Sequence, residues 1–186
     1  MARVAIGFMG LPGAGKSYGA KVLAYHHDTL VVNMGDVVRT IARSGDELGP
    51  DANGEDIGNW VTAQLANDEN AIISKVLTQI ESMDIGTPVI IDGVRTLADY
   101  DGIQREFDEF SLVFIDADDE TRLERLTSRG RDGEDEFTMA DLNRRDEREL
   151  SWGVSDLLEE EMYDYRIDNS KSRRETFAER LLNTLY

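Results

Sequence analysis

A glycine-rich segment near the start of the chain, GLPGAGKS at residues 10–17, ends in a lysine and a serine. It matches the spacing G-x-x-x-x-G-K-[ST], in which backbone N–H groups surround phosphate oxygens. The apolar run RVAIGF at residues 3–8 precedes it and a helical pattern over residues 18–25 follows, as the motif requires. We therefore predict nucleoside triphosphate binding, with Lys16 on the β- and γ-phosphates and the Ser17 hydroxyl on Mg²⁺. The expected ATP cradle comprises Gly10, Gly13, Ala14, Gly15, Lys16, Ser17 and Tyr18.

Two later segments place an aspartate, and an arginine three residues on, directly after an apolar run. They are Asp36 and Arg39 in NMGDVVR, and Asp92 and Arg95 in VIIDGVRT. A guanidinium can bind a phosphate through two parallel hydrogen bonds, and a carboxylate at a strand end can hold Mg²⁺ through water. Two plainer interpretations stay open: Asp36 as a helix N-cap with Arg39 on an exposed face, and Asp92 as a turn residue.

The elements that must position these residues can be placed from apolar periodicity. Short continuous apolar runs alternate with helical patterns, which predicts an α/β three-layer sandwich whose five-stranded parallel sheet is covered on both faces. In such sheets, ligands bind beyond the carboxyl ends of the strands. Strands are expected at 3–8, 30–32, 88–91, 111–115 and 165–167. Helices are expected at 18–25, 36–43, 56–65, 71–83, 119–129, 139–150 and 173–182, with a turn-rich segment at 44–54 and an exposed loop at 130–136.

The composition limits the classes of partner. The 186 residues carry a net charge of −18, and only four of the 20 basic residues are lysines. Such acidity opposes nucleic-acid binding and favours a salt-adapted protein, while the persistent apolar periodicity argues against disorder. No apolar run is long enough to span a bilayer, and the first ten residues do not form a signal peptide. We expect one cytoplasmic domain with no membrane or nucleic-acid partner, and favour a monomer. With no cysteine, disulfides and thiolate metal sites are excluded.

The segment after the second expected strand resembles the nucleoside monophosphate kinases. Gly35-Asp36-x-x-Arg39 is similar to the G-D-x-x-R segment of adenylate kinases. Asp92-Gly93-Val94-Arg95-Thr96 is similar to their D-G-F-P-R-T segment, with one residue fewer and no proline. The resemblance implies that Arg39 and Arg95 hold the phosphate of an acceptor. It implies that Asp36 orients the acceptor or a Mg²⁺-bound water, or acts as a weak base towards a hydroxyl.

The segment ERLTSR, residues 124–129, resembles the helix that leads into the lid of these kinases. The resemblance implies that Arg125 packs on adenine and that Arg129 reaches the phosphates, with Arg145 a further catalytic candidate. The lid is expected over about 129–150 and the acceptor-binding helices over about 36–83. Six arginines fall between residues 125 and 148, a high density in a chain with few basic residues. Arg131, Arg144, Arg145 and Arg148 could instead form salt bridges with neighbouring acids.

The carboxyl-terminal segment YDYRIDN, residues 163–169, resembles the A-D-x-x-I-x-N ending of dephospho-CoA kinases. Together with RDERELSWG at 145–153, these motifs resemble an archaeal family of predicted P-loop nucleotide kinases. The resemblance implies transfer of the γ-phosphate of Mg-ATP to a small nucleotide-like acceptor. The acceptor stays open between a nucleoside monophosphate and a ribose hydroxyl of the kind in dephospho-CoA. The alternative is a P-loop ATPase that switches or assembles a protein partner.

Overall fold

The computed structural model describes residues 3–44, 48–82 and 88–186, in which five strands form one sheet. The strands are β1 (Val4–Met9), β2 (Val31–Asn33), β3 (Val89–Asp92), β4 (Glu109–Asp116) and β5 (Tyr165–Asp168). Their order across the sheet is β2-β3-β1-β4-β5, and every neighbouring pair is parallel. The expected five-stranded parallel sheet is confirmed, with strand boundaries shifted by one or two residues.

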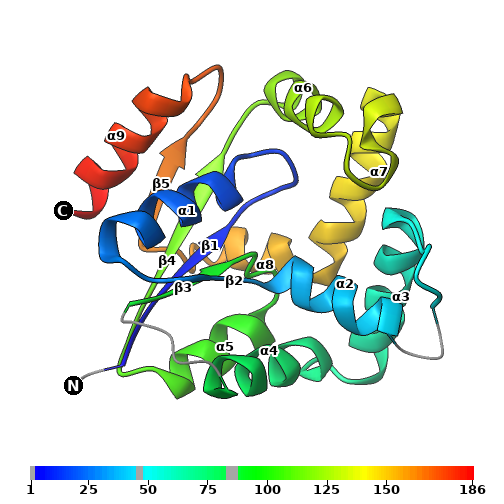
Figure 1. Cartoon of the computed structure of the whole chain (residues 1–186), viewed down its shortest axis with the longest axis horizontal. Helices are drawn as coiled ribbons and strands as arrows, with labels where there is room; N and C mark the ends of the chain where they lie inside the picture. The colour runs from blue at the N-terminus through cyan, green and yellow to red at the C-terminus, as the bar shows by residue number, and fades with distance from the viewer. Residues whose placement is uncertain (1–2, 45–47, 83–87) are drawn as a thin grey trace.

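Helices cover both faces of the sheet (Figure 1). The helices are α1 (Lys16–His27), α2 (Met34–Ser44), α3 (Gly54–Asn67), α4 (Ala71–Ser82), α5 (Leu97–Glu106), α6 (Asp119–Arg129), α7 (Met139–Glu149), α8 (Ser155–Glu159) and α9 (Arg174–Leu185). Helices α1 and α9 lie on one face, whereas α4 and α5 lie on the other (Figure 1). Helices α6 and α7 project beyond the sheet near the loop that follows β1 (Figure 1). In the described residues, no helix is both long and apolar enough to cross a bilayer.

The apolar strands divide their side chains between two cores. Successive side chains of a strand point to opposite faces, so adjacent residues enter different layers. Phe8 packs with Leu23 of α1 and Phe177 of α9, while the next residue, Met9, packs in the core beneath α2 to α5. The double burial explains why the strands read as continuous apolar runs.

The carboxyl ends of the first three strands meet at one edge. In the sheet register, Phe8 of β1 and Asn33 of β2 both pair with Asp92 of β3. The N–H groups of Gly93 and Val94 both donate to the Phe8 carbonyl at 3.0 Å. The residues that follow β1, β2 and β3 are therefore held beside one another, as the two Asp-x-x-Arg segments require.

Two expectations from the sequence were wrong. The segment 130–136 is not a simple exposed loop, because Arg131–Glu136 forms the 3₁₀ helix η1 and buries Glu134. Helix α5 was not expected; its N-terminus is closed by Thr96 and Asp99, each side chain accepting a backbone N–H from the other residue.

Other expected boundaries shift, and some fall outside the described residues. Helix α7 ends at Glu149 and continues into the π-helical turn η2 (Leu150–Val154). Residue 83 of the expected helix 71–83 and residues 45–47 of the turn-rich segment lie outside the described residues.

Candidate nucleotide and acceptor site

The loop after β1 has a backbone that its glycines permit. Gly10 has φ 135°, and a Cβ there would lie 2.2 Å from the carbonyl oxygen of Ile115. Gly15 has φ 108°, and a Cβ there would lie 2.4 Å from Nδ2 of Asn169. An L side chain rarely adopts such φ values, and here it also lacks space. The glycines at 10 and 15 therefore allow this loop to pass between β4 and the segment after β5.

The first turn of α1 is open for an anion. Gly15 is its N-cap and supplies no side-chain acceptor, and the turn contains no acidic residue. The first N–H groups of a helix lack partners within the helix, so they can bind phosphate with help from the helix dipole. By contrast, side chains of Asn53, Thr96, Asp118 and Thr138 cap α3, α5, α6 and α7. The Ser17 side chain is exposed in this first turn, where its oxygen could serve a hard cation such as Mg²⁺.

Lys16 is buried against its own loop. Its Nζ donates to the carbonyls of Gly10 at 2.6 Å and Leu11 at 2.9 Å. Burial lowers the pKa of Lys16 to about 8, although nearby Glu149 acts to raise it. The ammonium group thus lies beside the open helix N-terminus. A bound phosphate could take the place of the two carbonyl groups as its hydrogen-bond acceptor.

Asn33 connects the ends of β2 and β3. Its Oδ1 accepts the backbone N–H of Asp36 at 2.8 Å, and its Nδ2 donates to Oδ2 of Asp92 at 2.5 Å. Asn33 therefore provides the cap of α2, and the interpretation of Asp36 as that cap is wrong. Asp92 is 2% exposed and holds a fixed position one strand from the phosphate loop.

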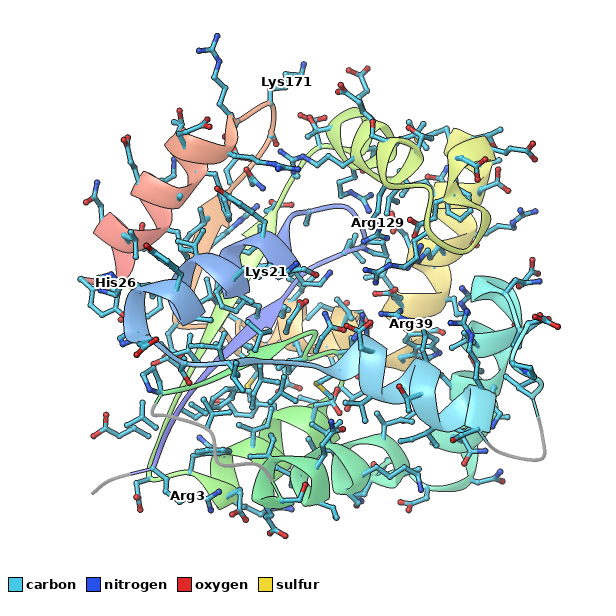
Figure 2. All side chains as sticks on the ribbon, viewed as in Figure 1. Arg3, Lys21, His26, Arg39, Arg129 and Lys171 are labelled. Carbon is cyan, nitrogen blue, oxygen red and sulfur yellow. The ribbon has the colours of Figure 1, made fainter. Side chains whose placement is uncertain are left out.

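Asp36 stands in the first turn of α2 with 63% of its side chain exposed. It forms an ion pair with Arg39, and Arg131 of η1 approaches its Oδ1 at 3.9 Å. Figure 2 shows Arg39 on α2 and Arg129 at the end of α6, both towards the side on which α7 lies. Asp36 thus lies between two guanidinium groups from different elements.

Glu149, a residue given no role by the sequence, lies at the centre of the arginine cluster. It is 4% exposed, and its Oε2 accepts from Nε of Arg95 at 3.2 Å. Nε of Arg145 lies 3.7 Å from its Oε1. Burial acts to raise the pKa of Glu149, but Arg95, Lys16 and Arg145 together hold it below the ordinary value. The carboxylate therefore connects Arg95, in the segment after β3, to Arg145 of α7.

Glu134 of η1 likewise pairs with two arginines from different elements. It accepts from Nε of Arg129 at 2.8 Å and from Nη1 of Arg145 at 2.5 Å. Burial acts to raise the pKa of Glu134, and the two arginines lower it overall. The structure thus places Arg129 and Arg145 together on one carboxylate. Arg144 is instead exposed and pairs with Asp141 on its own helix, as the salt-bridge interpretation held.

Two arginines of α6 donate hydrogen bonds to the phosphate loop. Nη1 of Arg125 donates to the Ala14 carbonyl at 3.1 Å, and its Nη2 donates to the Asn169 carbonyl at 2.8 Å. Arg122, which the sequence analysis did not single out, is 2% exposed. Its Nη1 donates to the Pro12 carbonyl at 3.1 Å and to Oδ1 of Asp146 at 2.9 Å. Arg122 thereby fixes α7 to the loop, and Arg125 connects the loop to the segment after β5.

A cleft of about 770 Å³ opens between α2, α3, α7 and the end of β3. Three of the expected arginines, Arg39, Arg95 and Arg145, line it. Its apolar part comes from Val38, Ile57, Val61, Leu65 and Ile72. Among the described residues, no three carboxylate or histidine side chains gather to hold a metal by themselves. Ser17 and Asp92 suit a Mg²⁺ ion that takes its remaining oxygens from phosphates and water.

The fold and the phosphate loop define a P-loop, kinase-like protein. The chain matches the AAA domain family over residues 9–141. Two solved structures share its fold: TT1252 from Thermus thermophilus and shikimate kinase from Acinetobacter baumannii in complex with shikimate. The first has a TM-score of 0.61 at 17% identity and covers 100% of this chain and 97% of its own. The second has a TM-score of 0.59 at 18% identity and covers 97% and 92%.

Relatives in archaea are closer in sequence. A UPF0200 protein of Methanoculleus marisnigri is 35% identical over 175 residues, which cover 94% of this chain and 91% of the relative. The chain belongs to this UPF0200 family, in agreement with the archaeal resemblance of its motifs.

Proposed function

We propose that the protein is a kinase that transfers the γ-phosphate of Mg-ATP to a nucleotide-like acceptor bound in the cleft. The observation that supports this most directly is the shared cluster around Glu149. Arg95, which lines the cleft, donates from Nε to Oε2 of Glu149 at 3.2 Å, and Lys16 of the phosphate loop is near enough to help lower the pKa of the same carboxyl group. Donor and acceptor phosphates bound at these two places would therefore be neighbours.

Each group has a defined part in the proposed transfer. The open N-terminus of α1 and Lys16 bind the donor phosphates. Ser17 and Asp92 would hold a Mg²⁺ ion, which would supply charge neutralisation at these phosphates. The bond from the γ-phosphorus to the leaving oxygen breaks and a bond to the acceptor oxygen forms. Arg39 and Arg95 hold the acceptor. Phosphoryl transfer depends mainly on positioning and charge neutralisation, which guanidinium groups supply.

The carboxylates in the cluster explain how the arginines stay ordered before substrates arrive. Glu134 and Glu149 occupy arginine donors that phosphate oxygens would use. An incoming phosphate replaces one anionic partner by another, so the guanidinium groups need little reorganisation. We expect Arg129 and Arg145 to move from Glu134 towards the transferred phosphate.

The position of Asp36 supports a phosphate acceptor over a hydroxyl acceptor. Its partners are two arginines, which suits an orienting carboxylate. A monophosphate acceptor is already anionic and needs no base, whereas a hydroxyl must lose a proton. Asp36→Asn discriminates between them: a kcat loss below about tenfold supports the monophosphate, and a loss of about 10²-fold or more supports the hydroxyl.

The test of the acceptor assignment is a panel of nucleoside monophosphates and dephospho-CoA, assayed with Mg-ATP in high salt. Arg39→Ala and Arg95→Ala should each raise the KM for the acceptor about tenfold or more, because each removes a charge-assisted contact. Arg105→Ala is the matched control, since Arg105 is exposed on α5 and pairs with Asp101 of the same helix. Unchanged acceptor affinity in both cleft variants would show that the acceptor binds elsewhere.

A second candidate is a P-loop ATPase whose nucleotide state controls a protein partner. The observation in its favour is that Arg95, Arg129 and Arg145 already have carboxylate partners within the chain. ATP turnover that is slow and indifferent to every member of the panel would favour this candidate over the kinase.

A further inference from the structure

The arginines that line the cleft differ in one respect. There are six of them in the part of the chain that the structure describes: Arg39, Arg95, Arg131, Arg144, Arg145 and Arg148. The first five each have a carboxylate oxygen within 4.0 Å, supplied by Asp36, Asp141, Glu134 or Glu149. Arg148 has no such partner among the described residues, although the chain has 38 acidic residues.

Arg148 is nevertheless closely packed. It extends from α7 onto Gly58 of α3, where a Cβ would lie 2.3 Å from its Cζ and 2.6 Å from its Nε. Its Nε is buried and has no hydrogen-bond partner in the described structure. A side chain at position 58 would displace the guanidinium from this place, so Gly58 allows the contact between Arg148 and α3.

Trp152 is a second neighbour of the guanidinium. The Cζ of Arg148 lies over the Trp152 ring at 5.9 Å from its centroid, within the range of a cation–π contact. The indole Nε1 donates to Oγ1 of Thr62 at 2.9 Å, which anchors the ring to α3. Gly58 and Trp152 together hold the guanidinium at the wall of the cleft.

The nearby charges compensate the charge of Arg148 only in part. Burial and the nearby charge of Arg145 lower the pKa of Arg148, although Glu149 and Glu55 act to raise it. A half-buried cation without a carboxylate partner is costly, and an anionic ligand on the side that lines the cleft would offset part of that cost.

We propose that Arg148, held between Gly58 and Trp152, binds a second anionic group of the acceptor, remote from the group that receives the phosphate. This deepens the proposed kinase function and rests on it. The acceptor class is then a nucleotide-like molecule with two separate anions, of which Arg39 and Arg95 hold one. The ligand of Arg148 is a phosphate or a carboxylate, because both offer paired oxygens in the plane of a guanidinium. The apolar residues of the cleft pack against the body of the molecule between them.

The acceptor can be tested with pairs of nucleotides that differ in one anionic group. Adenosine 3′,5′-bisphosphate against adenosine 5′-monophosphate adds a phosphate, and orotidine 5′-monophosphate against uridine 5′-monophosphate adds a carboxylate. Binding is measured by calorimetry with the full chain and Mg²⁺ at fixed high salt. We expect a preference of about tenfold or more for the doubly anionic member of one pair, as a charge-assisted hydrogen bond provides. The pair that shows it identifies the anion.

Three variants assign the preference to Arg148. Arg148→Met should abolish it, whereas Arg144→Met should keep it, because Arg144 also lines the cleft but is already paired with Asp141. Gly58→Ala should abolish it too, by displacing the guanidinium while favouring the helix. No preference in either pair, or a preference that survives Arg148→Met, overturns the proposal.

Binding and turnover separate this inference from the kinase proposal. A preference lost in Arg148→Met, with no phosphoryl transfer to any nucleotide, supports the second anion site and contradicts the kinase. Phosphoryl transfer to a nucleotide, with no preference for the doubly anionic member of either pair, supports the kinase and contradicts the second anion site. No binding of any of the four nucleotides contradicts both.

Discussion

In the phosphate loop, Lys16 is held by carbonyl groups five and six residues earlier in the chain, whereas in the cleft Arg95 is held by a carboxylate 54 residues later. The loop positions its cation with contiguous backbone and three glycines at positive φ. The cleft positions Arg95 and Arg145 with acidic side chains of η1 and of the end of α7. The phosphate loop is formed by one continuous stretch of sequence, whereas the cleft forms only when β3, η1 and α7 have come together.

The largest effect is expected from a substitution in the phosphate loop. Lys16→Met should reduce phosphoryl transfer, or ATP turnover in its absence, by about 10²–10³-fold, because it removes a preorganised charge on the transferred phosphate. Steady-state kinetics with Mg-ATP measure this. Lys21→Met is the matched control, since Lys21 is exposed on the same helix and should leave kcat within about twofold. Equal losses in both variants would contradict a special role for Lys16.

The second prediction concerns Arg122, which connects the phosphate loop to α7. Arg122 is almost fully buried and bonded to Asp146 and to the Pro12 carbonyl. Arg122→Met should lower the free energy of unfolding by about 3 kcal/mol, since it strands the Asp146 carboxylate in the interior. Urea unfolding measures the change. The exposed pair Arg105–Asp101 is the contrast, and Arg105→Met should cost less than about 0.5 kcal/mol.

A double variant checks the reason given for Arg122. Arg122→Met with Asp146→Leu removes both charges and should recover much of the lost stability. If the double variant is as unstable as Arg122→Met, the bond to the Pro12 carbonyl and the packing of the side chain carry the effect.

The same contrast explains what could be predicted from the sequence. The GLPGAGKS loop was recognisable because all its parts are contiguous, and the strands because they are buried on both faces. The placement of Arg39 and Arg95 at one edge followed from the rule that the carboxyl ends of parallel strands meet there. These predictions required no knowledge of distant contacts.

The carboxylates could not be placed in this way. Glu134 lies in GRDGEDE and Glu149 in RDEREL, where alternating charges read as solvated surface. Both are buried because arginines from other elements reach them, Arg145 for Glu134 and Arg95 for Glu149. Asn33 was overlooked because Asp36 offered a plausible cap three residues later. Helix α5 had a usable signal, the reciprocal caps of Thr96 and Asp99, which the DGVRT motif overlaps.

The third prediction concerns the strand end on the acceptor side. Asn33→Ala removes both the cap of α2 and the bond to Asp92, and should cost about 1–2 kcal/mol in urea unfolding. Asn33→Asp keeps an acceptor for the cap but sets a second carboxylate against Asp92. Its deficit relative to the wild type should shrink as the pH falls and one carboxylate becomes protonated. A deficit that does not change with pH would indicate that only the cap matters.

The smallest expected effect is a dependence of ATP affinity on pH, and it also concerns Lys16 of the phosphate loop. The pKa of Lys16 is about 8 without nucleotide, because the residue is buried. Bound triphosphate favours the ammonium form, so binding takes up a proton wherever Lys16 is partly neutral. ATP affinity should therefore fall by about fivefold between pH 8 and pH 9, with an uptake of about half a proton at pH 8. Calorimetry in two buffers of different ionisation enthalpy measures both quantities. Lys16→Arg keeps its charge throughout this range, so its affinity should lack this slope. If the affinity of Lys16→Arg fell with pH in the same way, the titrating group would not be Lys16 and would lie outside the phosphate loop.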